Sequence, residues 1–470
     1  MNRIKACFGC ICAALLLVSG ALSVYSYIQT VYYPDHQIEH RNLGWSRDVY
    51  VNWKEMYPEE ADEPESDASA EEEANGTVDG VANAEASEPS VNTARSVSQV
   101  KSYAAAMKNQ NAFDKFSEAF ETFKKDSKKA VGGRHPFTPA LYKLYGLFSK
   151  TIGKRSIEDD ESYVYRMGDG SLNFISGEQL SPSKADAVID FANWLKRRGT
   201  PLLCVIAGDK ADETLYDYPS GIKSFGYANT QRFASRLAEN DVPYLISMDV
   251  LAAVDPDPSA WFYKTDHHWN ANAGLTMAQT LAEIMRSDYG LTVDTALLQS
   301  DRFGSVVYKD AFLGSQGKKA KLGYTEREDF EVFYPKYETS FSLEAPNQGK
   351  SLIGSFSDTL IDGYTLKNKF CSGYNIYDYY TYWAFTHGDT ALVTIDNELC
   401  ENDTKVLVLK TSKANVINCY LSCAVKRMDI LDNRYFTGSV KTYIRQAEPD
   451  IVIMISGAPS SNGDNKWIVK

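Results

Sequence analysis

Residues 201–208 read PLLCVIAG, an apolar run without a charged side chain that has Pro at one end and Gly at the other. Runs of this kind are typical of strands buried on both faces of a sheet. The preceding residues, from Ser183 to Arg198, place apolar side chains at helical spacing. Fully apolar strands that alternate with helices indicate a parallel sheet covered by helices on both faces. The predicted fold class is therefore α/β.

The same alternation extends along the chain on the C-terminal side of this stretch. We predict a helix over 231–240, a strand over 242–248 and a helix over 273–289. Near the C-terminus the pattern returns, with strands over 405–410, 428–431 and 450–456 and helices over 415–425 and 440–446. Residues from about 291 to 400 interrupt it and are rich in Tyr, Phe and charge. We expect an insertion with antiparallel elements there.

The N-terminal segment has the composition of a membrane anchor. Arg3 and Lys5 precede an apolar run from about Ala6 to Ile28, which approaches the roughly 20 residues that a spanning helix needs. We predict an uncleaved membrane helix over residues 1–32 with its N-terminus in the cytoplasm, and a cleaved signal peptide is the alternative. Either way, the rest of the chain is exported. The predicted location is the cell membrane, with one spanning helix and an extracytoplasmic domain.

An acidic segment accounts for most of the net charge of −13. Between Pro58 and Glu88 lie twelve Asp or Glu and no Lys or Arg, so the remainder is close to neutral and nothing in its charge suggests a nucleic-acid partner. The segment has too few large apolar side chains to form a core. We predict a stalk and disordered acidic linker over 33–100, a helical lead-in over 101–155 and the α/β domain over 156–470.

The eight cysteines do not define a disulfide framework. Cys7, Cys10 and Cys12 fall at the membrane segment, and the other five are an odd number. Buried free thiols are the expected state of those five. The Cys7-x-x-Cys10 spacing falls at the membrane segment and is not interpreted as a metal or redox site, and no other Cys/His spacing supports zinc, so we predict neither a metal nor a cofactor.

Residues 265–270 read TDHHWN and place two of the six histidines beside a carboxylate. On an extended backbone, side chains two positions apart point to the same side, so Asp266 can meet His268 there, whereas on a helix it cannot. A carboxylate bonded to one ring nitrogen fixes the imidazole tautomer and leaves the other nitrogen free as a base. These residues supply two thirds of a hydrolase triad.

Ser412 is the candidate nucleophile. It lies between the predicted strand over 405–410 and the helix that follows, which is the arrangement of a nucleophile elbow. Carboxyl ends of parallel strands and the N–H groups of helix N-termini are where α/β proteins place their chemistry. The alternative is that Ser412 only caps the helix.

These motifs resemble the DHHW-motif family of bacterial cell-surface proteins and, more distantly, periplasmic alginate O-acetyltransferases, both within the SGNH hydrolase-like group. The resemblance covers roughly residues 150 to 470. It rests on TDHHWN at 265–270, KTSKAN at 410–415 and LDNRYF at 431–436, with weaker matches at 165–172 and 208–210. In these relatives Asp and His precede Ser, a permuted order compared with ordinary SGNH hydrolases. The resemblance implies that Asp266 orients the base, His268 is the base and Ser412 is the nucleophile.

The chain departs from the family pattern near the serine. Thr411 and Lys413 flank Ser412 where the family commonly has Asp and an aromatic residue, and Asp389 follows His387-Gly388 near the family's Gly-Asn position. These changes affect the stabilisation of an oxyanion rather than the three central groups.

Five further residues are predicted to contact substrate: His267, Trp269, Lys210, Asn415 and His387. If the DHHW segment is extended, His267 points away from His268, as a pocket wall or as a metal ligand with Asp266 and His387. Lys210 is expected either to bind an anionic group or to be a solvated loop residue. The aromatic run from Tyr374 to Trp383 is expected either to stack on sugar rings or to pack in the core.

The sequence thus predicts a membrane-anchored SGNH-type acyltransferase or esterase that acts on O-acetyl groups of a cell-surface polysaccharide. The same triad serves both reactions, because the exclusion of water decides between them. A transferase outside the cell needs an acyl donor, for which a multispanning membrane acyltransferase is the expected partner. The alternative is a catalytically inactive surface protein that binds glycan in an envelope assembly.

Overall fold

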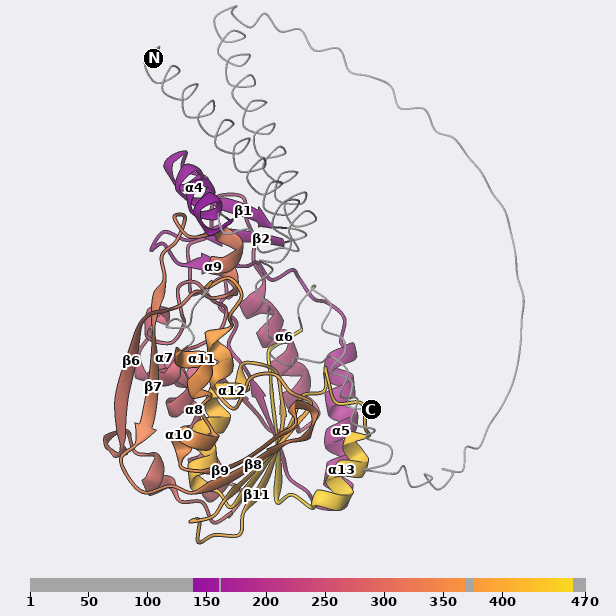
Figure 1. Cartoon of the computed structure of the whole chain (residues 1–470). Coiled ribbons are helices and arrows are strands. Elements are labelled where there is room, and N and C mark those ends of the chain that lie inside the picture. Colours follow the sequence, from indigo (N-terminus) through magenta and orange to yellow (C-terminus); the bar gives the residue numbers. More distant parts are fainter. Residues whose placement is uncertain (1–137, 160–161, 368–374, 460–470) are drawn as a thin grey trace, which may run out of the picture. The chain divides into compact units, whose positions relative to one another are not determined.

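The computed structural model of the chain describes residues 138–159, 162–367 and 375–459, and its main sheet has eight strands in the order β5-β4-β13-β11-β12-β10-β8-β9 (Figure 1). From β5 to β12 neighbouring strands run parallel, and the last three join antiparallel. The strands are β4 (Leu202–Ile206), β5 (Tyr244–Ile246), β8 (Phe341–Ala345), β9 (Lys350–Gly354), β10 (Leu392–Asn397), β11 (Lys405–Lys410), β12 (Arg427–Leu431) and β13 (Ile451–Ser456). The predicted α/β class with a mostly parallel sheet is confirmed.

Apolar clusters cover both faces of the sheet. In β4, Leu203 and Val205 enter one cluster, whereas Leu202, Cys204 and Ile206 enter the other. The first cluster includes helices α7 (Ser247–Val254), α8 (Ala271–Ser287) and α12 (Ala414–Leu421), and the second includes α5 (Ser183–Arg198), α6 (Gly226–Ala238) and α13 (Val440–Ala447). Strands that are apolar at every position are buried in this way because neither face meets water.

Helix α8 and helix α12 approach each other closely because α8 has a glycine at their contact. A Cβ added at Gly274 would lie 2.4 Å from Cγ2 of Val416. The two helices begin directly after the DHHW segment and the Ser412 turn, respectively. Their packing therefore brings together two segments that are 144 residues apart in the chain.

The region from 291 to 400 contains the expected antiparallel elements, but they are not all separate from the main sheet. β6 (Phe303–Phe312) and β7 (Glu328–Pro335) form a ladder of their own, whereas β8, β9 and β10 extend the main sheet beside β12. Their antiparallel direction explains why the continuous apolar pattern ended. β8 alternates buried and more exposed positions, and β9 alternates half-buried and exposed ones. The short helices in this region are η3 (Thr295–Leu298), η4 (Ser300–Arg302), α9 (Ser315–Ala320), η5 (Pro346–Gln348), α10 (Phe356–Thr359), α11 (Gly363–Lys367) and η7 (Thr381–Ala384).

The described part begins with helix α4 (Thr138–Thr151), which lies in the predicted lead-in. A small antiparallel sheet follows, formed by β1 (Ser156–Asp159), β2 (Ser162–Arg166) and β3 (Leu172–Asn173). The predicted membrane helix over 1–32, the linker over 33–100 and the lead-in before residue 138 lie outside the described residues. Within 138–159, 162–367 and 375–459, no helix combines the length and apolar character needed to cross a membrane.

The described cysteines are free thiols. Cys204, Cys419 and Cys423 are buried, and Cys400 is half-buried. Burial raises the pKa of Cys204 to about 12, so this thiol stays protonated and unreactive. The predicted free, buried state therefore holds for three of them, while Cys371 lies outside the described residues.

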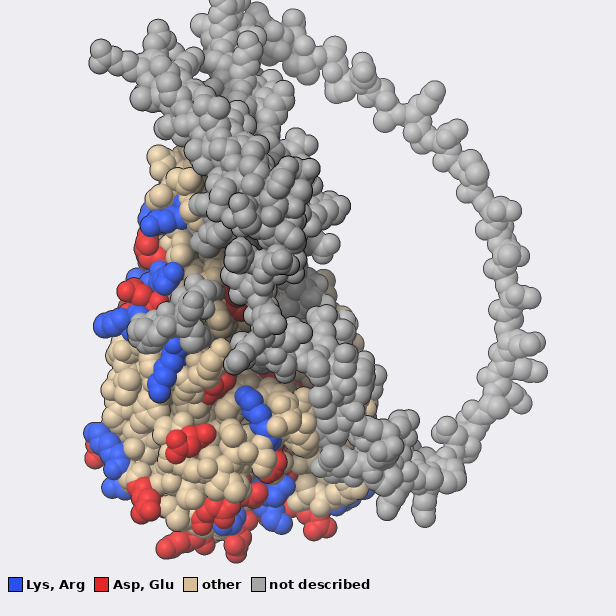
Figure 2. Space-filling view, in the orientation of Figure 1, with Lys and Arg blue, Asp and Glu red and all other residues tan. Residues whose placement is uncertain are grey.

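Charged side chains of both signs are interspersed on the face of the molecule in Figure 2. Several are paired across the surface, such as Arg232 with Glu178 and Lys309 with Asp329. Exposed pairs of this kind contribute little to stability.

Candidate active site

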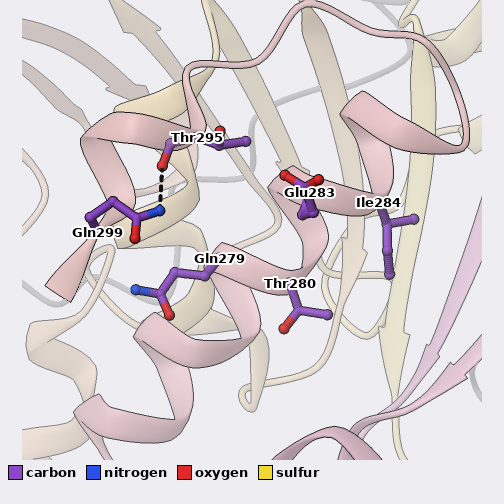
Figure 3. Close-up of a pocket in the computed structure, with 6 residues that line it drawn as sticks. All are labelled: Gln279, Thr280, Glu283, Ile284, Thr295 and Gln299. Atoms are coloured by element: carbon purple, nitrogen blue, oxygen red, sulfur yellow. Dashed lines mark hydrogen bonds between the residues drawn. The ribbon is translucent and has the colours of Figure 1, made fainter.

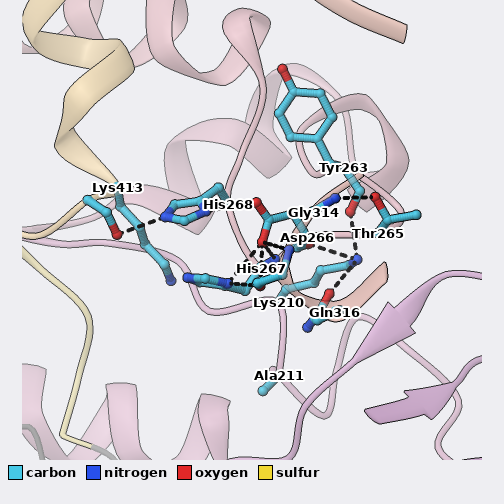
Figure 4. A network of polar contacts seen from close by, with 12 residues as sticks. Lys210, Ala211, Tyr263, Thr265, Asp266, His267, His268, Gly314, Gln316 and Lys413 are labelled. Atoms are coloured by element: carbon cyan, nitrogen blue, oxygen red, sulfur yellow. Dashed lines mark hydrogen bonds and ion pairs between the residues drawn. The ribbon is translucent and has the colours of Figure 1, made fainter. Parts of the chain in front are cut away.

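A buried lysine organises the loop that carries the two histidines. The Lys210 side chain follows β4 and is 1% exposed, and its ammonium donates to the carbonyls of Tyr263, Lys264 and Asp266 at 2.6, 2.9 and 3.0 Å (Figure 4). Burial lowers the pKa of Lys210 to about 7. Three carbonyl acceptors nevertheless match the three donors of the charged amine. Through these three hydrogen bonds, Lys210 fixes the backbone of residues 263–266.

Two further contacts shape this loop. The Glu328 carboxylate accepts from the backbone N–H groups of Lys264 and Thr265, both at 2.7 Å. Gly314 permits the close approach of Asp266, because a Cβ at Gly314 would lie 2.2 Å from the Asp266 Cβ. The loop is therefore held by residues from three separate parts of the chain.

Ser412, His268 and Asp266 form a hydrogen-bonded row. His268 Nε2 lies 2.7 Å from Ser412 Oγ, and His268 Nδ1 lies 3.0 Å from Asp266 Oδ2. The indole of Trp269 donates to the carbonyl of Lys413 at 2.6 Å, which ties the histidine loop to the serine turn. Such a row has the geometry of a nucleophile, a base and an orienting acid.

The electrostatics of the row favour a neutral imidazole. Burial and the neighbouring His267 lower the pKa of His268 to about 4, although Asp266 opposes this. Burial alone would raise the pKa of Asp266, but the two imidazoles hold it well below its usual range. At neutral pH the row therefore contains a carboxylate and a His268 whose Nε2 accepts a proton.

The serine turn also offers backbone donors. Residues after β11 turn at Thr411 and Ser412 and then enter α12, where Ala414 N–H donates to Thr411 and Asn415 N–H donates to Ser412. The N–H groups of Ser412 and Lys413 donate to no acceptor within the described residues. Unpaired N–H groups at a helix N-terminus stabilise an oxyanion.

The backbone of the DHHW segment is not extended as we predicted. It bends at His267 and His268, inside a loop whose ends are joined by a bridge between Phe262 and Trp269. Asp266 still meets His268, but the prediction that His267 points away is wrong. The His267 and His268 rings lie on the same side, with their centroids 3.9 Å apart, because the bend replaces the alternation of a strand.

Four of the five predicted substrate contacts are buried and bonded within the protein. Trp269 and Asn415 have no exposed surface, and Lys210 and His387 are 1% and 8% exposed. His387 is not part of the DHHW cluster, because its Nδ1 contacts Lys350 Nζ at 2.9 Å and its Nε2 the Thr359 carbonyl at 2.7 Å. These positions favour supporting roles, whereas the His267 side chain is 35% exposed.

A buried ionic network lies behind the serine turn. Lys410 is 1% exposed and contacts Asp389 at 2.9 Å, Asp432 at 3.4 Å and the Asn415 amide oxygen at 2.6 Å. Arg434 binds both oxygens of Asp432 and also contacts Asp389 at 3.1 Å. The two cations hold the pKa of Asp389 down at about 2, against the effect of burial. Asp389, one of the departures from the family pattern, is therefore a structural anion here.

The chain reaches Asp389 through a left-handed stretch. Thr386, His387 and Gly388 have φ angles of 45°, 58° and 82°. A β-branched residue with positive φ is an outlier, and such backbone persists only where its surroundings hold it. The Thr386 hydroxyl donates to the Asn415 carbonyl at 3.3 Å, which links this stretch to α12.

Tyr382 is a site residue that sequence reasoning did not single out. Its ring stacks on His268 with centroids 4.1 Å apart, and it is 3% exposed. It belongs to the predicted aromatic platform but is buried in the core. Tyr380 of the same run is half exposed; Lys318 Nζ lies 3.6 Å from its ring centroid, and the Trp383 ring stacks on it at 4.8 Å. Tyr374 lies outside the described residues.

Asp266, His267 and His268 also offer metal-ligand atoms within 4.8 Å of one another. Both oxygens of Asp266 and both Nδ1 atoms already take part in hydrogen bonds or charge contacts within the cluster. A cation would have to break these contacts, so the donor set fits a hydrogen-bonded network better than a metal centre.

A surface hollow of about 410 Å³ has a lining that does not include Asp266, His268 or Ser412 (Figure 3). Its lining comes from the second half of α8 and from residues around η3: Gln279, Thr280, Glu283, Ile284, Thr295 and Gln299. None of these is a candidate site residue. Its one titratable lining residue, Glu283, is exposed, and its pKa is lowered by the neighbouring Arg286, so no titratable groups converge on the hollow as they do in a reaction site.

Comparison with known proteins agrees with the resemblance found in the sequence. Residues 171–310 match the family described as SGNH hydrolase-like domain, acetyltransferase AlgX. This stretch includes Asp266 and His268 but not Ser412. No curated protein matches the chain.

Solved structures provide the wider comparison. PatB1 of Bacillus cereus, described with a sulfonyl adduct, is 18% identical over 67% of this chain and 99% of its own, with a TM-score of 0.52. A DHHW family protein from Eubacterium siraeum is 15% identical over 67% of this chain and 96% of its own, with a TM-score of 0.49. The O-acetyltransferase domain of Pseudomonas putida AlgJ is 13% identical over 65% of this chain and 96% of its own, with a TM-score of 0.37. The chain is thus similar in sequence, over residues 171–310, to the SGNH hydrolase-like domain of the acetyltransferase AlgX, and similar in fold to PatB1.

Proposed function

We propose that this chain is an exported, membrane-anchored SGNH-type enzyme that transfers O-acetyl groups to, or removes them from, a cell-surface polysaccharide. The observation that carries the proposal is the row from Ser412 through His268 to Asp266, with contacts of 2.7 and 3.0 Å. These distances lie within the range of catalytic hydrogen bonds, about 2.6–3.2 Å. A serine that only capped α12 would not need a base that a buried carboxylate orients.

In the proposed reaction, His268 Nε2 takes the proton of Ser412 as Oγ attacks the ester carbonyl. Asp266 holds Nδ1–H and stabilises the imidazolium that forms. The N–H groups of Ser412 and Lys413 receive the charge on the carbonyl oxygen. His268 then returns its proton to the leaving alcohol, and the acetyl group remains on Ser412. A sugar hydroxyl or water completes the cycle by the same steps in reverse.

The choice of acetyl transfer is supported by the similarity to acetyltransferase domains over residues 171–310. The acyl donor outside the cell would come from a multispanning membrane acyltransferase, and the predicted helix over 1–32 would keep the enzyme beside it. The competing hypothesis, an inactive glycan-binding protein, rests on the departures at Thr411, Lys413 and Asp389. The 2.7 Å contact between Ser412 and His268 favours the enzyme.

The test is turnover of p-nitrophenyl acetate by the purified full-length chain, compared with Ser412→Ala and His268→Ala. We expect both variants to lose turnover by about 10³-fold or more while their unfolding curves stay close to wild type. Mass spectrometry should find an acetyl group on Ser412 of the wild type. A folded wild type that shows no acetyl-Ser412 and no turnover above the variants would instead support the glycan-binding protein.

A further inference from the structure

His267 is a second imidazole on the same carboxylate, and the row of Ser412, His268 and Asp266 does not use it. Its Nδ1 lies 3.0 Å from Asp266 Oδ1, the oxygen that His268 leaves free. The Ser315 hydroxyl and its backbone N–H also bond this oxygen, at 2.7 and 3.2 Å. Ser315 opens helix α9 and comes from a part of the chain that no motif marked.

The hydrogen bonds fix the tautomer of His267. A carboxylate oxygen only accepts, so the single proton of the Ser315 hydroxyl points to Asp266. The Ser315 oxygen, 2.9 Å from His267 Nδ1, then accepts the proton on that nitrogen. His267 therefore carries its proton on Nδ1, and Nε2 bears a lone pair.

This lone pair has no partner among the described residues. The His267 side chain is 35% exposed, and no described residue bonds its Nε2. His268 has the same orientation, with Nδ1 on Asp266 and Nε2 toward Ser412. In Figure 4 the two rings lie one above the other, and both extend from Asp266 toward Lys413. Two acceptor nitrogens thus lie side by side, on rings 3.9 Å apart.

We propose that His267 contacts the acceptor, its Nε2 taking a hydrogen bond from the carbohydrate hydroxyl next to the one that is acetylated. A hydroxyl has one proton, and the reacting hydroxyl gives its proton to His268. His267 must therefore bind a different hydroxyl, and neighbouring hydroxyls on one sugar ring match two neighbouring imidazoles. This inference rests on the proposed acetyl transfer and assigns its acceptor as a vicinal diol.

The transfer step balances without a proton on His267. The reacting hydroxyl loses its proton to His268 Nε2, and its oxygen forms a bond to the acetyl carbon. The bond from that carbon to Ser412 Oγ breaks, and His268 returns the proton to Ser412. His267 holds the second hydroxyl throughout and acts by orientation.

The experiment separates the two halves of the reaction in the full-length chain. Acetyl-Ser412 formation is followed by the burst of p-nitrophenol from p-nitrophenyl acetate. The fate of the acetyl group is measured by mass spectrometry, as acetylated methyl glycosides of glucose, mannose and galactose, as methyl acetate from added methanol, or as free acetate. The first ratio to compare is glycoside over methanol, since methanol has one hydroxyl.

His267→Asn is the decisive variant. The Asn amide nitrogen replaces Nδ1 as donor to Ser315 and Asp266, but the acceptor at Nε2 is lost. We expect the preference for glycoside over methanol to fall about tenfold, the effect of one hydrogen bond, and to fall by more than any change in the burst rate. His267→Gln, whose amide reaches the Nε2 position, should restore part of the preference.

Each other outcome has a definite meaning. If the wild type acetylates no glycoside, or if His267→Asn keeps the preference, His267 does not contact the acceptor. If the burst and the preference fall together, His267 acts only by positioning Asp266. If the wild type forms no acetyl-Ser412 at all, the proposed function itself fails, and that result is distinct from the others.

Discussion

The two halves of the site are built in different ways. Ser412 lies on a regular strand, turn and helix, in which β11 and α12 follow one another directly. His268 lies on an irregular loop that depends on Lys210, Glu328 and Gly314, all remote in sequence. Local pattern therefore positions the proposed nucleophile, whereas tertiary contacts position the proposed base. Substitutions that address one half at a time can test this difference.

Asp266→Asn should have the largest effect. An amide at this position cannot accept from His268, Ser315 and the His267 N–H as a carboxylate does, so the tautomer of His268 is no longer fixed. We expect kcat on p-nitrophenyl acetate to fall by about 10³- to 10⁴-fold. Urea unfolding serves as the control for folding. A kcat within tenfold of wild type would show that the loop does not need its carboxylate.

Lys210→Met tests the support of the loop. Methionine fills similar space but removes the ammonium from the carbonyls of Tyr263, Lys264 and Asp266, of which Lys264 keeps the Leu172 N–H as a donor. We expect this loss to lower the free energy of unfolding by about 3 kcal/mol. Lys309→Met is the matched control, since the Lys309 side chain is 73% exposed and pairs with Asp329 at the surface. It should cost less than about 1 kcal/mol. Equal effects in the two variants would contradict the supporting role of Lys210.

Gly274→Ala tests how the halves are joined. The added Cβ overlaps the buried side chain of Val416, so α8 and α12 must separate. We expect a loss of about 1–3 kcal/mol in urea unfolding, together with lower turnover as Ser412 moves from His268. Gly363→Ala is the control because a Cβ there meets nothing within 4 Å. A Gly274→Ala variant as stable as wild type would mean that the helix contact is adaptable.

The pH dependence probes the environment of His268. A base works only when unprotonated, so activity falls as the pH drops through its pKa. Because that pKa is lowered to about 4, the acidic limb of kcat/KM should lie well below pH 6.5. His267 contributes to the lowering, so His267→Asn should move the limb upward. A wild-type limb at or above pH 6.5 would contradict a buried, neutral His268.

Chelation should have the smallest effect. The hydrogen bonds among Asp266, His267 and Ser315 already occupy the Asp266 carboxylate and His267 Nδ1. We therefore expect excess EDTA to leave turnover unchanged, measured beside an untreated sample. A loss of activity that added Zn²⁺ restores would replace the hydrogen-bonded network with a metal centre.

The sequence predicted the regular half of the site closely. The limits of β11 and α5 agree with the predicted ranges 405–410 and 183–198, because an apolar run and a helical period are local signals. The meeting of Asp266 with His268 was also anticipated. The bend that brings His267 to the same side was not, because it follows from Gly314 and Lys210, which no local pattern connects to the loop.

Among the other parts of the site, Ser315 carried no sequence signal, and Tyr382 carried only that of an aromatic run. Ser315 and Tyr382 come from the region that interrupts the α/β pattern, and only the folded chain brings them to Asp266 and His268. Tyr382 could not be separated from its aromatic neighbours by composition. Residues that act through a single tertiary contact are, in general, invisible to periodicity.

The position of β13 sets an order in time for the assembly of the site. In the sheet, β13 lies between β4 and β11 and pairs with both, while these two strands do not pair with each other. Lys210 follows β4, and Ser412 follows β11. During synthesis, Lys210 leaves the ribosome before Ser412, and the strand β13 that joins their two parent strands leaves after both. Pairings this distant in sequence close slowly, so the site should become complete only after residues 451–456 have entered the sheet.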